Sequence, residues 1–225
     1  QRYYGKNTPD PLNIDAGLPM VIGANGFPVR NSQQKIVGNS MPKWIGSINN
    51  TFTYKNWGLS FLIDTHQGLK TWNQLDNFMS AFGIAKYTEN RDQTIVFPGV
   101  HADGTTNTTP VYLGQGVGPD GVDYGDGYYR KIYRGVTEEF VQDASWVRLR
   151  TISLSYTIPS TWLKGSFVKG AALSFTGNNL WLSTPYNGFD PEASDVSSGD
   201  LTASTQAGFT YPQLRSYLFT LNVNF

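Results

Sequence analysis

The sequence predicts an all-β fold of antiparallel strands, and three observations support this prediction. The 225 residues include 24 Gly and 12 Pro spread along the chain, and apolar residues at helical spacing are scarce. Five segments instead alternate apolar residues with small polar ones at the period of two that strands require. No run of about 18 apolar residues occurs, so this chain could cross a membrane only with strands.

The charge balance and the missing cysteines exclude several classes of function. The 17 Lys and Arg residues equal the 17 Asp and Glu residues, so the chain lacks the basic surface that binding of nucleic acid requires. Cysteine is absent, which excludes disulfides, thiol catalysis and zinc held by cysteine. We therefore expect no nucleic-acid partner.

The five predicted strands are long. The first two form a hairpin, because their alternating segments flank the polar pair Lys55 and Asn56, and two residues suffice for such a turn. In the third strand the alternation assigns a face only to the second half, where Ile152 and Leu154 lie opposite Ser153. The predicted ranges are 44–54, 57–67, 146–158, 170–182 and 215–225.

The connections between these strands fall into two classes of length. Two residues join the first pair of strands and about a dozen join the third and fourth, whereas segments 1–43, 68–145 and 183–214 are long loops. Because antiparallel strands alternate in direction, the short turns emerge at one end of the sheet and the long loops at the other. This asymmetry is typical of outer-membrane barrels with long extracellular loops. Five strands cannot close a barrel, which needs about eight, so the chain would be part of a larger one.

A transmembrane sheet and a soluble β-sandwich would both show alternation, but the polar positions favour the membrane. They carry Ser, Thr, Asn and Gly with almost no charge apart from Asp64, whereas a face in water normally carries Lys, Glu, Arg and Asp. The strands run to about 11 residues, as a tilted bilayer crossing requires. A soluble, surface-exposed β-sandwich that binds carbohydrate remains the alternative. Aromatic residues near strand ends, expected to form interfacial girdles, are Trp44, Tyr54, Trp57, Tyr156, Trp181, Tyr217 and Phe225.

Several short motifs recur in a specific order and spacing. They are Val37–Trp44, Phe97–Val100, Asn107–Pro110, Asp143–Arg150 followed by Ile152–Tyr156, Gly177–Leu180, Gly188–Glu192 and Tyr211–Tyr217. Together they resemble the C-terminal portion of SusC/RagA-type TonB-dependent outer-membrane transporters of Bacteroidetes. The resemblance covers nearly the whole chain and is weakest within 1–35 and 114–135.

The resemblance implies a plugged barrel of roughly 22 strands in the outer membrane, of which this chain supplies the last five or so. The family's signal peptide, plug domain and TonB-contacting segment would lie outside this chain. Members import bulky nutrients, oligosaccharides or peptides, with a SusD-like lipoprotein as partner and energy delivered through TonB. Phe225 is similar to the C-terminal aromatic signal that the outer-membrane assembly machinery recognises.

Candidate ligand-binding residues come from the long loops, since flat aromatic faces beside carboxylates and amides suit glycan recognition. The same rings could instead pack the loops internally. Residues 72–85 have apolar positions at helical spacing and predict a short amphipathic helix. The candidates are Trp72, Tyr112, Tyr124, Tyr128, Tyr129, Asn107 and Asp190.

Catalysis and metal binding find little support in the sequence. The aspartates of segment 120–126 hint at calcium, but their spacing is wrong for an EF-hand and a solvated acidic turn is favoured. His66 and His101 are the only histidines, too few for a zinc site. Asp190 and Glu192 could form a glycosidase pair, yet they lie in a loop matched by the transporter family. We expect no catalytic residue, no metal and no cofactor.

Overall fold

The computed structural model describes residues 19–31, 34, 36–193, 206–207 and 209–225. The chain divides into two compact units, which are described separately. The strand unit comprises residues 41–69, 143–193 and 211–225. The described residues of the loop unit are 19–31, 34, 36–40, 70–142, 206–207 and 209–210.

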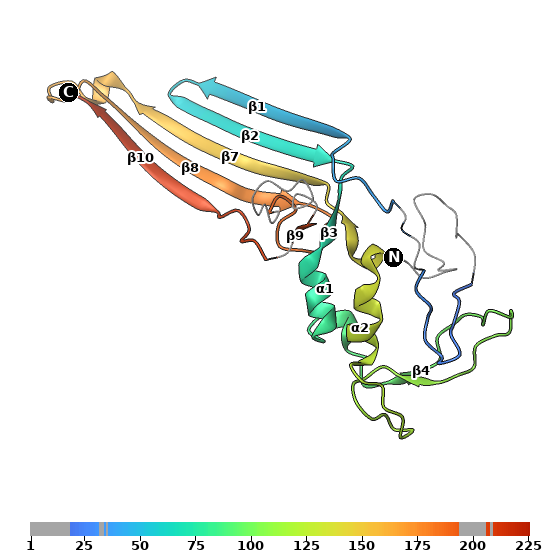
Figure 1. Ribbon diagram of the computed structural model, residues 1–225. Helices are drawn as coiled ribbons and strands as arrows, with labels where there is room; N and C mark the ends of the chain where they lie inside the picture. The colour runs from blue at the N-terminus through green and yellow to red at the C-terminus, as the bar shows by residue number, and fades with distance from the viewer. Residues whose placement is uncertain (1–18, 32–33, 35, 194–205, 208) are drawn as a thin grey trace. The chain divides into compact units, whose positions relative to one another are not determined.

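The strand unit is one antiparallel sheet of five strands in the order β1-β2-β7-β8-β10 (Figure 1). The strand bounds are Trp44–Tyr54 for β1, Trp57–Gln67 for β2, Trp146–Ile158 for β7, Gly170–Ser183 for β8 and Ser216–Asn224 for β10. These bounds agree with the predicted ranges to within one residue. The sheet is not closed, because β1 and β10 each have only one neighbour.

The short turns follow from local chemistry. Lys55 adopts a left-handed conformation with φ of 52°, which a two-residue hairpin turn requires, and Tyr54 pairs directly with Trp57. Pro159 ends β7, and the short helix η4 (Ser160–Trp162) begins the connection to β8. The N–H of Lys169 donates to the carbonyl of Asn224 at 2.8 Å, so this connection lies beside the end of β10.

One face of the sheet is a continuous apolar surface that extends across all five strands. Opposed residues share a face, and the register pairs Ile48 with Ile63, Leu59 with Leu154 and Phe175 with Phe219. Of these side chains, Ile48 is 61% exposed and Phe219 is 80% exposed. A β-sandwich would bury this face against a second sheet, so the soluble alternative is not favoured. The fold is that of a transmembrane β-barrel segment, with its apolar face outward.

The opposite face carries the polar residues and also accommodates two arginines. Simple alternation would place Arg148 and Arg150 on the apolar face together with Ile152. The register shifts at Arg150, however, so that Leu149 pairs with Ile63 on the apolar face while Arg148 pairs with Asp64 on the polar face. Arg150 is thus the extra residue of a β-bulge, and the bulge reverses the facing of the first third of β7.

The loop unit contains short elements joined by irregular backbone. In chain order they are β3 (Lys70–Asn73), α1 (Gln74–Ala81), η1 (Lys86–Thr88), β4 (Thr94–Ile95), β5 (Val111–Tyr112), α2 (Gly127–Lys131), η2 (Tyr133–Gly135), η3 (Thr137–Phe140) and β9 (Gln206–Ala207). Strand β6 (Val141–Asp143) leads from η3 toward β7. Among the described residues no helix is long and apolar enough to cross a bilayer.

Helix α1 lies within the predicted range but is shorter. Asn73 is its N-cap, and Oδ1 of Asn73 accepts from the N–H of Asp76 at 3.0 Å. The helix ends at Ala81, and Gly83 then adopts φ of 68°. Local capping chemistry therefore sets both ends of the helix.

A small apolar core stabilises the rest of the loop unit. Its buried members come from segments far apart in sequence, and rings of Phe27 and Tyr124 pack against it. Phe27 stacks on Tyr128 with ring planes 8° apart. The buried core residues are Ile22, Phe97, Val111, Leu113 and Tyr128.

Candidate functional site

Five charged side chains of the strand unit meet on the polar face of the sheet. We call them the ion-pair cluster: Asp64, Arg148, Arg150, Asp190 and Glu192. Nη2 of Arg148 donates to Oδ1 of Asp190 at 2.5 Å. Nε of Arg150 donates to Oδ2 of Asp64 at 2.9 Å, and Nη2 of Arg150 donates to Glu192. The two arginines thereby join β2, β7 and the segment that follows β8.

A further contact in the ion-pair cluster is ionic without being a good hydrogen bond. Nε of Arg148 lies 2.9 Å from Oε2 of Glu192, yet neither atom has a partner in hydrogen-bond geometry. Two guanidinium groups face three carboxylates, so the cluster holds one formal negative charge in excess. Arg148 is 2% exposed and Asp190 is 3% exposed, and buried charges of this kind are stable only when paired.

Backbone groups hold Asp190 in place. The N–H of Glu192 donates to Oδ1 of Asp190 at 3.0 Å, and the N–H of Gln213 donates to Oδ2 at 3.1 Å. Asp190 therefore links the segment after β8 to the segment before β10. Both of its oxygens are used and the side chain is buried, so a glycosidic oxygen cannot reach it. This arrangement does not support the glycosidase alternative for Asp190 and Glu192.

Aromatic rings flank the ion-pair cluster. Trp146, which is 2% exposed, stacks on His66 with ring centroids 4.5 Å apart. The guanidinium carbons of Arg148 and Arg150 lie 5.8 Å and 5.1 Å from the Trp146 ring centroid. A cation within about 6 Å of an indole is attracted to it. The indole thus stabilises both arginines on the polar face.

The loop unit has its own cluster of tyrosines, in which Tyr87, Tyr128, Tyr129 and Tyr133 make mutual ring contacts. The hydroxyl of Tyr129 donates to Oδ1 of Asn90 at 2.5 Å. Burial raises the pKa of Tyr129, and burial together with neighbouring acidic groups raises the pKa of Tyr133 to about 12. The phenols of Tyr129 and Tyr133 therefore remain protonated at neutral pH.

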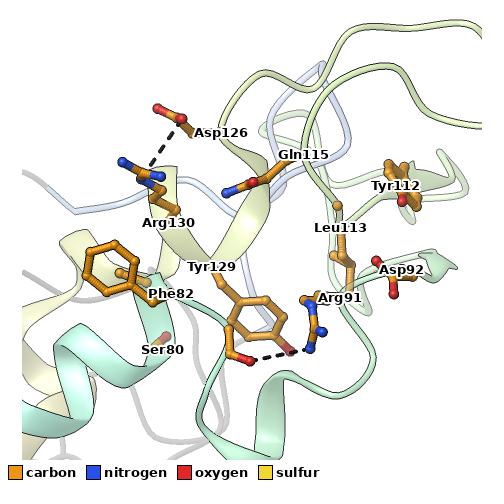
Figure 2. Close-up of a pocket in the computed structure, with 13 residues that line it drawn as sticks. Ser80, Phe82, Arg91, Asp92, Tyr112, Leu113, Gln115, Asp126, Tyr129 and Arg130 are labelled. Atoms are coloured by element: carbon orange, nitrogen blue, oxygen red, sulfur yellow. Dashed lines mark hydrogen bonds and ion pairs between the residues drawn. The ribbon is translucent and has the colours of Figure 1, made fainter.

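A pocket of about 330 Å³ opens beside this cluster (Figure 2). Its lining combines the ring of Tyr129 with charged groups of both signs, and Figure 2 shows Arg91, Gln115 and Arg130 around that ring. Nε of Arg130 lies 4.0 Å from Oδ1 of Asp126 at the rim. The other residues that line this pocket are Ser80, Ala81, Phe82, Gly83, Asp92, Tyr112, Leu113 and Gly114. The volume is at the lower end of the roughly 300–1,000 Å³ typical of small-molecule sites.

The predicted ligand-binding residues do not converge on one site. Tyr112 and Tyr129 line the 330 Å³ pocket, whereas Tyr124 lines a second pocket of about 430 Å³ in the same unit. Trp72 lies in β3, half-buried and paired with β9. Tyr128 is buried in the core at 8% exposure.

Two predicted residues carry polar groups that are already engaged. Nδ2 of the buried Asn107 donates to the carbonyl of Phe97 at 2.9 Å, and Oδ1 of Asn107 accepts from the N–H of Thr109 at 3.1 Å. Asp190 belongs to the ion-pair cluster. Both side chains position the backbone around them, so a contact with ligand stays a prediction.

The acidic turn of segment 120–126 uses its carboxylates within the turn. Oδ2 of Asp120 accepts from the hydroxyl of Tyr124 at 2.7 Å, and Oδ1 of Asp123 accepts from the N–H of Gly125 at 2.8 Å. The hydrogen bond from Tyr124 lowers the pKa of Asp120. Among the described residues no three metal-ligating side chains converge.

Sequence reasoning missed Arg148 and Arg150 as members of a site, as well as Arg91 and Arg130, and it considered Glu192 only as a partner of Asp190 in a glycosidase pair. A signal for Arg148 and Arg150 was present in the sequence. Both arginines fall at the alternate positions of a membrane-length strand that carry apolar residues further along it. Such a conflict indicates either a bulge or a buried ion pair. Arg91 and Arg130 had no comparable signal, since exposed loop arginines are common.

Comparisons with known proteins agree with this geometry. No protein-family model matches the chain. The TonB-dependent receptor P26 of Formosa agariphila is 27% identical over 233 aligned positions, which cover 94% of this chain and 21% of the receptor. The TonB-dependent receptor P3 of the same organism is 25% identical, covering 88% of this chain and 18% of the receptor. This chain thus spans about a fifth of the length of these relatives.

Solved structures give the same fold. The RagAB peptide importer in the open-open state matches with a TM-score of 0.56 at 20% identity, covering 92% of this chain and 20% of the matched chain. Its closed-closed state matches with a TM-score of 0.54 at 20% identity, covering 90% of this chain and 20% of the matched chain. The resemblance to SusC/RagA-type TonB-dependent receptors is confirmed, and the similar proteins are receptors and importers, not enzymes.

Proposed function

We propose that the chain forms part of the wall and the loops of an outer-membrane transporter that imports bulky nutrients, oligosaccharides or peptides. Similarity to TonB-dependent receptors over 94% of the chain supports this function. The mechanism would be binding of cargo at the loops, followed by passage along the polar face when TonB acts on a plug outside this chain. No covalent bond of the cargo would change.

The distribution of charge across the sheet is the observation on which this proposal rests. The apolar face exposes Ile48, Leu154 and Phe219, whereas the charged residues Asp64 and Arg148 lie on the polar face. A barrel wall needs this division, since an Arg or Lys facing lipid at mid-depth costs about 2–4 kcal/mol. The polar face would line the lumen, and the ion-pair cluster would belong to the lumen wall.

The long loops would be extracellular, and a SusD-like lipoprotein would cover them. Of the predicted ligand contacts, the half-exposed Trp72, Tyr112, Tyr124 and Tyr129 are the ones that cargo could reach. The buried Tyr128, Asn107 and Asp190 would fix the shape of the loops. Phe225 is 70% exposed and stacks on Phe167 with ring centroids 5.6 Å apart, so it is available as an assembly signal.

Membrane association and uptake test the proposal in the complete receptor. The receptor should stay in the envelope fraction after a high-salt wash and be released by detergent. Cells that lack it should then lose uptake of either a fluorescently labelled oligosaccharide mixture or a labelled peptide mixture. Release by salt alone, or unchanged uptake of both mixtures, would contradict the proposed function.

Loop substitutions test the ligand contacts separately. Tyr112→Ala and Tyr129→Ala alter the 330 Å³ pocket and should lower uptake without changing the amount of receptor in the membrane. Tyr54→Ala is the matched control, because Tyr54 lies at the short-turn end of β1. If Tyr54→Ala lowers uptake as much as the pocket variants do, the assignment of cargo to these loops is wrong.

A further inference from the structure

The apolar face of the sheet is not smooth. A hollow of about 570 Å³ opens on it, with walls from four strands and one turn of the strand unit. Leu154, Phe175 and Phe219 are among its apolar lining residues. In the proposed barrel the surface around the hollow faces lipid, so the hollow would be continuous with an interface that hydrocarbon covers.

Amphipathic rings stand at the short-turn end of this hollow. Trp57 and Tyr156 have ring centroids 4.6 Å apart, and both line the hollow. Trp162, in η4, lines it too and is 72% exposed. Indole and phenol rings take this position where hydrocarbon meets lipid headgroups. The hollow therefore extends from the headgroup level into the apolar layer.

Positive charge gathers at the same end. The structure describes every residue of segments 44–63, 151–189 and 216–225. The charged side chains in these segments are those of Lys55, Lys164 and Lys169, and no acidic residue occurs there. Lys55 lies in the β1–β2 hairpin, two residues from Trp57, and Lys164 follows Trp162 by two residues. The third lysine is Lys169, and all three are exposed.

From these features we infer that the hollow is a binding site for an anionic phospholipid. An acyl chain fills the space lined by Leu154, Phe175 and Phe219, while the ammonium groups of Lys55 and Lys164 hold the lipid phosphate. Basic residues beside a membrane surface attract anionic headgroups in this way. The inference rests on the lipid-facing sheet and not on the cargo.

Native mass spectrometry of the complete receptor in mild detergent tests this site. Dioleoylphosphatidylglycerol should remain bound, whereas dioleoylglycerol, which has the same chains without phosphate, and inorganic phosphate alone should not. Lys55→Gln and Lys164→Gln should each weaken binding about fivefold, the equivalent of about 1 kcal/mol per lysine. Leu154→Trp fills the hollow and should abolish binding. Lys86→Gln removes an exposed lysine of the loop unit and should change nothing.

Each outcome decides the question. Equal retention of both lipids, or equal binding by Lys164→Gln and Lys86→Gln, would overturn the phosphate contact. Undiminished binding by a folded Leu154→Trp receptor would overturn the hollow as the site. Because Lys55 and Lys164 are exposed, their replacement by Gln should leave the receptor folded, and any loss of lipid binding can be assigned to the missing charge. Native mass spectrometry detects bound lipid without any measurement of transport. A receptor that binds lipid but imports nothing would therefore contradict only the proposed function.

Discussion

Replacing Arg148 with methionine should release segment 188–192 from the polar face of the sheet. Arg148 and Asp190 are almost fully buried, so water cannot replace the lost cation, and removing one partner of a buried pair costs about 3–5 kcal/mol. The N–H groups of Glu192 and Gln213 still donate to Asp190, which places the expected cost at the lower end. About 3 kcal/mol corresponds to a rise of about a hundredfold in the population of the open segment.

Amide hydrogen exchange in the complete receptor measures this population. The amides of Glu192 and Gln213 are protected by their hydrogen bonds to Asp190, so both should exchange about a hundredfold faster in Arg148→Met. A double variant that adds Asp190→Asn removes the uncompensated charge and should recover part of the protection. Unchanged exchange at both amides in Arg148→Met would refute the reasoning that the ion-pair cluster holds this segment.

An exposed ion pair provides the control. Arg130 and Asp126 are 4.0 Å apart and both are largely exposed, so Arg130→Met should leave local opening unchanged. If Arg130→Met opened its segment as much as Arg148→Met opens segment 188–192, burial would not explain the effect.

Three further changes test the facing of the sheet and the loop unit. Leu221→Arg puts a charge on the apolar face at a cost of about 2–4 kcal/mol and should block assembly, measured as heat-modifiable mobility, whereas Thr220→Arg on the polar face should be tolerated better. Equal assembly of the two would contradict the assigned facing. Asn73→Ala removes the N-cap of α1 and should destabilise this helix by about 1 kcal/mol, measured as faster exchange of the Asp76 amide, while Asn73→Asp should retain the cap. Burial raises the pKa of Asp76 in the folded protein above its ordinary value of 3.8. The stability of α1 should therefore be greatest below pH 3.8 and should fall as the pH rises through the raised pKa. In Asp76→Asn this dependence of α1 opening on pH should be absent, and its persistence would assign the effect to another group.

Much of the sheet follows from local sequence. The hairpin at Lys55 and the ends of β7 and β8 are fixed by alternation and turn chemistry, which act within a few residues. Helix α1 was predicted for the same reason, but its length depends on the cap at Asn73 and on Gly83. The loop candidates were less predictable, because an aromatic ring in a long loop packs equally well in a core, as Tyr128 does, or beside a pocket, as Tyr129 does.

By itself, the sequence determined the strands, the face of most of their residues and the resemblance to TonB-dependent receptors, because backbone period and motif order are properties of the chain alone. The tertiary structure decided where the charges go. The bulge at Arg150 turns Arg148 away from lipid, and Asp190 and Glu192, about forty residues later, meet the two arginines there. Pairing of buried charges depends on which segments meet in space, and no local pattern encodes that meeting.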